Sequence, residues 1–249
     1  MIPYFSFSSI MIGPITIQVW GLLASIGFLF ALYLSLKQAK KNNFDQDHIW
    51  DVFVIILIGM ILGSRILNII FNFDKIGNIK DIFLFTGGFS LIGGVILSFI
   101  FLYIYARSKK IDIYKVIDNL ILGAVVALTI TRVGCFLIYD HIGKVTSVFW
   151  GRIYADGSIR HPVIIYHIIS AIVIIFFICY LRKAHLKKKA LVLCVVLFYS
   201  ITRFFLDFLR CNDLNICDSR YYNLTYTQWL LLILMPFVTY LLTNNSNNN

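Results

Sequence analysis

Seven stretches of the sequence are almost entirely apolar, and each is near the length needed to cross a lipid bilayer. They lie at residues 15–36, 50–71, 82–105, 116–138, 162–181, 190–209 and 228–243. A spanning helix needs about 20 such residues to cross about 30 Å of hydrocarbon. None of the stretches alternates apolar and polar residues as barrel strands do, and an isolated span must satisfy its own backbone hydrogen bonds. The sequence therefore predicts an all-α polytopic membrane protein with about seven transmembrane helices.

The composition excludes an ordinary soluble domain. The chain has 249 residues, of which 59% are hydrophobic and only 14% are charged, whereas soluble domains average about 25% charged residues. The N-terminal stretch MIPYFSFSSIMIGP has no basic start and no small-residue cleavage site, so no signal peptide is expected. We predict one membrane domain over residues 1–243, with an external loop at 139–161 and a disordered, Asn-rich tail at 244–249.

Lysine and arginine residues are distributed unevenly between the two sets of connecting loops. The loops after the first, third and fifth spans contain twelve of them: Lys37, Lys40, Lys41, Arg107, Lys109, Lys110, Lys115, Arg182, Lys183, Lys187, Lys188 and Lys189. The other loops contain seven: Lys75, Lys80, Lys144, Arg152, Arg160, Arg210 and Arg220. Basic loops favour the cytoplasmic side, which predicts an external N-terminus and a cytoplasmic C-terminus. The net charge of +10 then reflects topology and attraction to membrane lipids, and a nucleic-acid partner is not expected.

Three arginines lie inside predicted spans. Arg65, Arg132 and Arg203 each fall nearer the external end of an outward-running span. Each of them could reach independently toward lipid phosphates or water. Their matching depth on three helices instead favours a shared site, and a guanidinium fork suits a phosphate. The expected ligand is an anion with an apolar body, for which a phospholipid is the natural choice.

Two further patterns lie at the same predicted depth. The third span begins TGGFSLIGG, in which glycines surround Ser90, and paired glycines permit either close helix packing or exposed backbone amides. Near the end of the sixth span, one helical face carries Tyr199, Arg203, Asp207 and Arg210. This face predicts a polar stripe leading out of the membrane, although an Arg–Asp pair at this spacing is also a common structural ion pair.

Cys211 and Cys217 share the last predicted external loop. A disulfide between them suits an oxidising compartment, and two free thiols are the alternative. There is no CxxC pair in the sequence to indicate a metal site.

Six segments, in the same order, resemble those of the prolipoprotein diacylglyceryl transferase family. They are GSRILNIIF, GGFSLIGG, RVGCFLIYDHIG, WGRIYADGSIRHPVIIYH, YSITRFFLDFLR and TQWLLLI. The resemblance covers nearly the whole chain. It implies a seven-span enzyme of the bacterial cytoplasmic membrane, with its active site toward the external face. Such an enzyme transfers the diacylglyceryl group of phosphatidylglycerol to the lipobox cysteine of a preprolipoprotein and needs no cofactor or metal.

The resemblance also implies the site residues. Catalytic roles are expected for Arg132, Arg203, Asp140, Asp207 and Tyr199. Residues expected to bind phosphatidylglycerol are Arg132, Arg203, Arg65, Arg210, Gly143, Ser90 and Gly93. Arg132 and Arg203 would hold the phosphate, whose charge grows as the bond to the glyceryl carbon breaks.

The chain departs from the family pattern at several positions. Ile92 replaces the usual third-span histidine, Trp20 replaces a tyrosine, and Tyr139 replaces the glycine before the acid of the central motif. The change at residue 92 removes a candidate proton acceptor. Asp140, Asp207, His141 or the phosphate itself remain as acceptors, while His161 is expected to order the loop. Two other functions stay open: an impaired relative that binds phospholipid or lipoprotein, and a transporter of lipids or anions.

Overall fold

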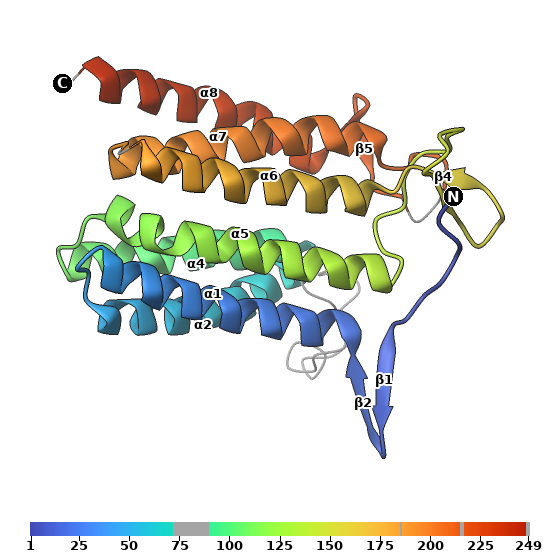
Figure 1. Ribbon diagram of the computed structural model, residues 1–249, viewed down its shortest axis with the longest axis horizontal. Coiled ribbons are helices and arrows are strands. Elements are labelled where there is room, and N and C mark those ends of the chain that lie inside the picture. The colour runs from blue at the N-terminus through green and yellow to red at the C-terminus, as the bar shows by residue number, and fades with distance from the viewer. Residues whose placement is uncertain (72–89, 185, 215–216, 248–249) are drawn as a thin grey trace. The chain divides into compact units, whose positions relative to one another are not determined.

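The computed structural model describes residues 1–71, 90–184, 186–214 and 217–247. Within these residues the fold is mostly helical (Figure 1). The seven α-helices of the described residues are α1 (Val19–Lys41), α2 (Gln46–Phe71), α4 (Leu91–Ser108), α5 (Ile113–Leu137), α6 (Val163–Lys183), α7 (Lys188–Leu206) and α8 (Tyr226–Asn247). Six of them are long and apolar enough to span a membrane, and the apolar part of α4, Ile92–Ser108, is shorter. The all-α fold class is confirmed, and the chain is a multi-pass membrane protein.

Several boundaries differ from those expected. Residues 15–18 do not belong to the first span. They form strand β2 (Ile15–Gln18), which pairs antiparallel with β1 (Ser9–Ile12), because Gly13 turns the chain with a φ of 60°. Helix α8 runs to Asn247, so residues 244–247 are helical where the sequence predicts disorder. The first eight residues of the predicted span at 82–105 lie outside the described residues.

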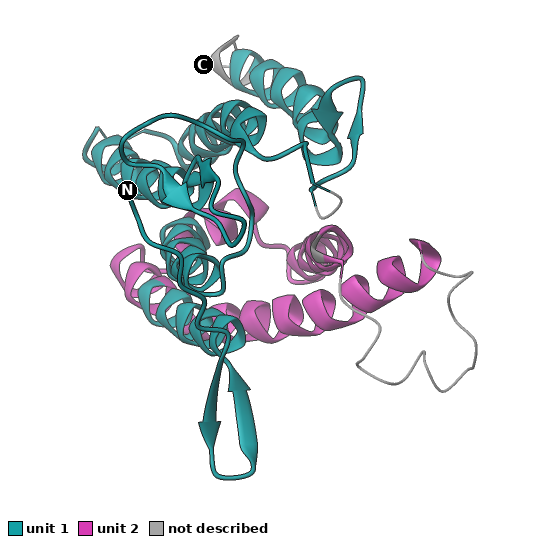
Figure 2. Ribbon diagram, turned by 90° about the vertical axis from the view of Figure 1, so that its right-hand side faces the viewer, with its two compact units in different colours: residues 1–34, 120–249 teal, residues 35–119 magenta. Residues whose placement is uncertain are grey.

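The chain divides into two compact units, drawn in different colours in Figure 2. One unit comprises residues 1–34 and 120–249, and the other comprises residues 35–119. Their boundaries fall inside α1 and α5. The single-domain organisation stays a prediction.

In the unit of residues 35–119, α2 packs closely on α4 through small residues. Gly59 and Gly63, spaced as GxxxG, face Ser98 and Gly93 of α4. Side-chain atoms added to these glycines would collide with the facing backbone, so the helices approach as small-residue interfaces in membranes do. The Ser98 hydroxyl donates a hydrogen bond of 3.0 Å to the carbonyl of Ile56. The third-span glycines that are described therefore serve helix packing.

In the other unit, α6 lies beside α7 and α7 beside α8 (Figure 1). The connection between α5 and α6 contains strands β3 (Arg152–Ile153) and β4 (Ile159–Arg160). The connection between α7 and α8 contains a short 3-10 helix, η2 (Asp207–Leu209), and strands β5 (Arg220–Tyr221) and β6 (Leu224–Thr225). The two connections are joined through their backbones, where Cys211 donates to Ile142 and Lys144 donates to Leu209, both at 2.9 Å. This junction fixes the end of α7 against the segment that follows α5.

Candidate active site

A small pocket lies between α5, α6 and α7, near the ends at which the two joined connections leave the helices. Its polar lining comes from all three helices: Arg132, His167, Ser170, Tyr199, Thr202 and Arg203. Arg132 lies five residues before the end of α5, Arg203 three before the end of α7, and His167 four after the start of α6. At 1.5 Å per residue, all three therefore lie about one turn inside the same end of the unit. The structure thus brings three of the expected site residues, Arg132, Tyr199 and Arg203, to one pocket.

Arg203 is held by partners on two sides. One terminal nitrogen, Nη1, donates to Nε2 of His167 at 2.7 Å. The other, Nη2, lies 3.2 Å from Oδ1 of Asp207. Arg203 and Asp207 stand four residues apart at the end of α7, a spacing that places them on one face. The guanidinium is therefore held at the pocket wall, and the carboxylate of Asp207 balances its charge.

Asp207 is the centre of a larger polar network. Its Oδ1 also lies 3.9 Å from Nη1 of Arg210, and its side chain is completely buried. The hydroxyl of Thr225 donates to Oδ2 at 3.2 Å. One buried carboxylate thus faces two arginines and needs both, because an unpaired buried charge is costly. In the described geometry Asp207 holds arginines in place.

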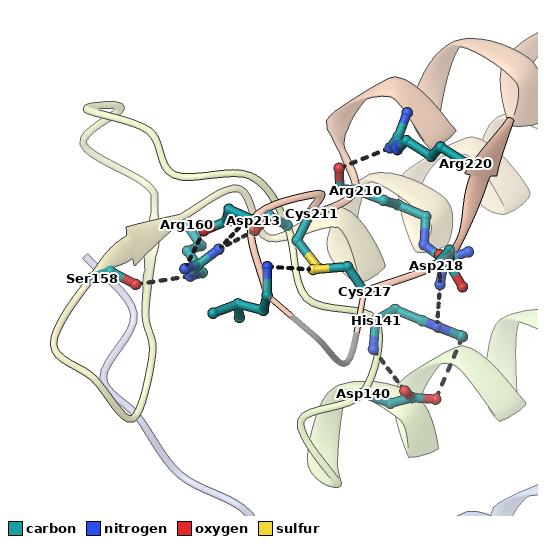
Figure 3. Close-up of a disulfide and its surroundings, with 12 residues drawn as sticks. Asp140, His141, Ser158, Arg160, Arg210, Cys211, Asp213, Cys217, Asp218 and Arg220 are labelled. Carbon is teal, nitrogen blue, oxygen red and sulfur yellow. Dashed lines mark hydrogen bonds and ion pairs between the residues drawn. A yellow bond between two sulfur atoms is a disulfide. The ribbon is translucent and has the colours of Figure 1, made fainter. Parts of the chain in front are cut away.

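Arg210 connects the network to the segment after α5 (Figure 3). Its Nη2 lies 3.0 Å from Nδ1 of His141 and 2.6 Å from Oδ2 of Asp218. Since arginine only donates, Nδ1 of His141 is the acceptor. Nε2 of His141 lies 3.5 Å from the carboxylate of Asp140, whose side chain is 47% exposed. Arg210 therefore serves as a bridge between the two connections.

His141 is held neutral by this environment. Burial lowers its pKa to about 4 and outweighs the opposing effect of Asp140, and Arg210 lowers the pKa further. Arg210 and Asp140 engage its two ring nitrogens, and His141 is not among the residues that line the pocket. The structure therefore favours a structural role for His141 over the role of proton acceptor.

A disulfide closes the loop that follows Arg210. Cys211 and Cys217 are bonded to each other, which decides between the two alternatives that the sequence leaves open. On this loop, Asp213 accepts two hydrogen bonds from Arg160, at 3.0 and 2.8 Å (Figure 3). These bonds lower the pKa of Asp213. The loop is thereby tied to β4 through Asp213 and to Arg210 through Asp218.

Gly143 lies where two backbones come together. It pairs with Arg210 in an isolated β-bridge, and its carbonyl accepts a hydrogen bond of 3.2 Å from Arg160. A Cβ at this position would collide with the carbonyl group of His161. The glycine is thus required by close packing, and it positions Arg210.

Tyr139 occupies a conformation that suits the glycine it replaces. Its φ is 62°, in the left-handed region that costs a side-chain-bearing residue about 1–2 kcal/mol. Its ring lies 3.7 Å from the guanidinium carbon of buried Arg152, and its hydroxyl donates to the carbonyl of Ile153. These contacts offset the strain and explain how a tyrosine is tolerated at this turn.

Two groups of described side chains have metal-ligand spacing, and one of them contains the two cysteines of the disulfide with Asp213. In the other group, the ligand atoms of Cys135, Asp140 and His141 all lie within 4.8 Å of one another. However, Arg210 already donates to His141, and a cation placed here would meet that guanidinium. We therefore interpret these residues as part of the hydrogen-bond network.

The remaining expected site residues belong to the other unit. Arg65 lies on α2, six residues before its end. Ser90 precedes α4 and donates its backbone N–H to the carbonyl of Ser64 at 3.1 Å, and Gly93 faces Gly63. The convergence of Arg65 with Arg132 and Arg203, and substrate contacts of Ser90 and Gly93, stay predictions.

Sequence reasoning missed His167. This residue is only 8% exposed and contacts Arg203 directly. The available signal was an ionisable side chain one turn inside an apolar span, which is a functional candidate by itself.

Comparison with known proteins agrees with the family resemblance. The family model described as prolipoprotein diacylglyceryl transferase matches residues 8–243. Three similar curated proteins carry the name phosphatidylglycerol–prolipoprotein diacylglyceryl transferase. The protein from Clostridium novyi is 29% identical over 82% of this chain and 84% of its own length. The proteins from Clostridioides difficile and Clostridium tetani are 30% and 32% identical, over 83% and 77% of this chain and 84% and 80% of their own lengths.

Proposed function

The chain belongs to the prolipoprotein diacylglyceryl transferase family, and we propose that it transfers the diacylglyceryl group of phosphatidylglycerol to the lipobox cysteine thiol of a preprolipoprotein. A bond forms between sulfur and the glyceryl carbon, and the bond between that carbon and the phosphate oxygen breaks. The electron pair of the broken bond leaves with glycerol phosphate, and the thiol proton passes to a base. The observation that carries the proposal is the pocket that Arg132 and Arg203 share, in a chain similar to named transferases over most of its length.

Arg132 and Arg203 form the proposed phosphate clamp. The phosphate of the lipid has one negative charge before the reaction, and the leaving group gains a second. Two guanidinium groups fixed in a water-poor site stabilise the charge that develops, and an oriented fork does so without reorganisation. The fixed orientation of Arg203, between His167 and Asp207, supports this role.

Tyr199 lines the same pocket, and its phenol is a hydrogen-bond donor for a phosphate or carbonyl oxygen. Arg210 and Gly143 hold the two connections together, so their contribution to binding is to position the pocket. Arg65, Ser90 and Gly93 are retained as candidate lipid contacts on the evidence of sequence alone.

The proposed location is the bacterial cytoplasmic membrane, with the pocket toward the external face. The basic loops at 37–41, 107–115 and 182–189 favour the cytoplasmic side, which would place the two joined connections outside. The Cys211–Cys217 disulfide supports the same orientation, because disulfides persist in oxidising compartments. A preprolipoprotein would then approach along the external surface with its signal peptide in the membrane.

Two other functions remain to be separated from transfer: an impaired relative that only binds phospholipid or lipoprotein, and a transporter. The decisive experiment is complementation of a bacterium depleted of its own transferase, with mass spectrometry of a reporter lipoprotein. A gain of one diacylglyceryl unit on the lipobox cysteine is the expected result. An unmodified reporter at normal membrane levels of the protein would favour the binding function, and movement of labelled lipid without a thioether would favour transport.

A further inference from the structure

His167 is a buried histidine in the pocket of the phosphate clamp. Its side chain is 8% exposed, and it shares the pocket with Arg132, Tyr199 and Arg203. Nε2 accepts a hydrogen bond of 2.7 Å from Arg203. An imidazole that accepts at Nε2 has its proton on Nδ1 and is neutral. The pocket therefore contains a neutral nitrogen base about one turn inside the end of α6.

The other candidate proton acceptors, Asp140, His141 and Asp207, are not among the residues that line this pocket. The oxygens of Asp207 face Arg203, Arg210 and Thr225. Nδ1 of His141 accepts from Arg210, and Asp140 lies beside His141 with its side chain 47% exposed. Tyr199 is a phenol, which is a poor proton acceptor. Among the described residues that line the pocket, His167 is the one with a basic nitrogen lone pair.

We propose that His167 is the proton acceptor of the transfer reaction, a role that rests on the proposed function. Nε2 of His167 takes the proton from the thiol as sulfur attacks the glyceryl carbon. The electron pair of the breaking carbon–oxygen bond goes to the phosphate. The imidazolium then returns the proton to the released glycerol phosphate, so His167 ends each cycle neutral.

The charges around His167 make this step depend on the bound lipid. Arg132 and Arg203 share the pocket with His167, and Asp207 connects Arg203 to Arg210. Burial and Coulomb repulsion from the two guanidinium groups both oppose an imidazolium here. The phosphate offsets that repulsion and also takes hydrogen bonds from Arg203, which releases Nε2. The base is thereby activated only when the substrate is in place.

The test compares His167→Gln with the wild-type protein. Gln places an acceptor oxygen near the position of Nε2, so it keeps the bond to Arg203 and removes only the proton acceptor. Loss of a general base lowers rates about 10²–10⁴-fold. We expect a loss of that size in kcat at pH 7, with KM for phosphatidylglycerol within a few-fold of wild type. His167→Ala should lose activity and should also raise KM for phosphatidylglycerol. His48→Gln in α2 is the matched control, and we expect it to have wild-type activity.

The pH dependence separates proton transfer from mere positioning of Arg203. Without a base, the rate follows the thiolate fraction, which rises about tenfold per pH unit below the thiol pKa of about 8.5. The deficit of His167→Gln should therefore shrink by about tenfold per unit between pH 6.5 and 8.5. All rates are normalised to the amount of protein in membranes, and His167→Asn replaces the glutamine variant if that variant does not accumulate.

Two outcomes would overturn the proposal for His167. One is a glutamine variant with wild-type kcat at pH 7, and the other is a deficit that is equal at every pH. If the wild-type protein itself makes no thioether, the proposed function fails and the assignment of His167 falls with it. An active wild type therefore distinguishes failure of this inference from failure of the function.

Discussion

Oδ1 of Asp207 lies 3.2 Å from Nη2 of Arg203, and the carboxylate is entirely buried. The same oxygen faces Arg210 at 3.9 Å. The pair therefore has a dual role, because Asp207 balances an arginine at the pocket and another that holds the neighbouring loop. Removing the negative charge would leave the buried guanidinium of Arg203 without its counterion and Arg210 with Asp218 alone.

Asp207→Asn should consequently impair both folding and transfer. Breaking a buried pair by removing one partner costs about 3–5 kcal/mol, and the misaligned Arg203 should lower transfer by about a hundredfold or more. Membrane levels measured by blotting and transfer per molecule measured with a reporter lipoprotein check the two effects. Asp156→Asn is the control, because Asp156 also lies near an arginine, 3.7 Å from Arg160, but is 48% exposed. Equal behaviour of the two variants would contradict the role assigned to Asp207.

If Arg132 and Arg203 form a phosphate clamp, a positive charge alone at either position should be insufficient for transfer. Arg132→Lys and Arg203→Lys keep the positive charge but lose the planar fork, which orients two donors at once. Each variant should insert normally and lose transfer by about a hundredfold or more, as assayed by the mass of the reporter. Arg107→Lys, at the basic end of α4 and exposed, should retain full activity. If both pocket variants transfer at the wild-type rate, the clamp is wrong.

The glycines between α2 and α4 predict a packing defect. A Cβ at Gly63 or at Gly93 would collide with the backbone of the other helix. Gly63→Ala and Gly93→Ala should therefore lower thermal stability in detergent and lower membrane levels together. Gly21→Ala in α1, where no heavy atom lies within 4 Å of the added carbon, is the control for folding. A Gly93→Ala variant that is stable but inactive would instead support the lipid contact predicted from the sequence.

Much of the fold was predictable because a bilayer restricts the alternatives. Apolar stretches of spanning length have to form helices, and the observed helices follow those stretches. Errors occurred where local backbone chemistry decides the structure. The apolar residues Ile15 and Ile17 extend the first hydropathic stretch, yet they pair with β1 in a hairpin.

The site was predictable in part, because the spacing of Tyr199, Arg203 and Asp207 on one helix is a property of the sequence. Contacts between segments far apart in the sequence were not predictable. The bond between His167 and Arg203 joins residues 36 positions apart, and the bridge from Arg210 to His141 joins residues 69 apart. Hydropathy and helical period contain no information about such pairings. The disulfide was undecided for the same reason, since spacing alone does not distinguish bonded from free thiols.

Acid should weaken the junction that His141 forms with Arg210. The pKa of His141 falls from 6.5 to about 4 on folding, so between these values the unfolded chain binds a proton that the folded chain does not. Folding stability should therefore decrease as pH falls from about 6.5 and level off below about 4. Apparent Tm of the purified protein in detergent, measured from pH 7 to pH 4.5, checks the trend.

The variant His141→Asn isolates this contribution. Asparagine keeps an acceptor near the position of Nδ1 for Arg210 but does not titrate. Its Tm should be less sensitive to acid than that of the wild type over the same range. An unchanged slope in His141→Asn would place the acid sensitivity elsewhere. Because Arg210 also shares Asp207 with Arg203, loss of this junction at low pH should be accompanied by loss of transfer in the wild type.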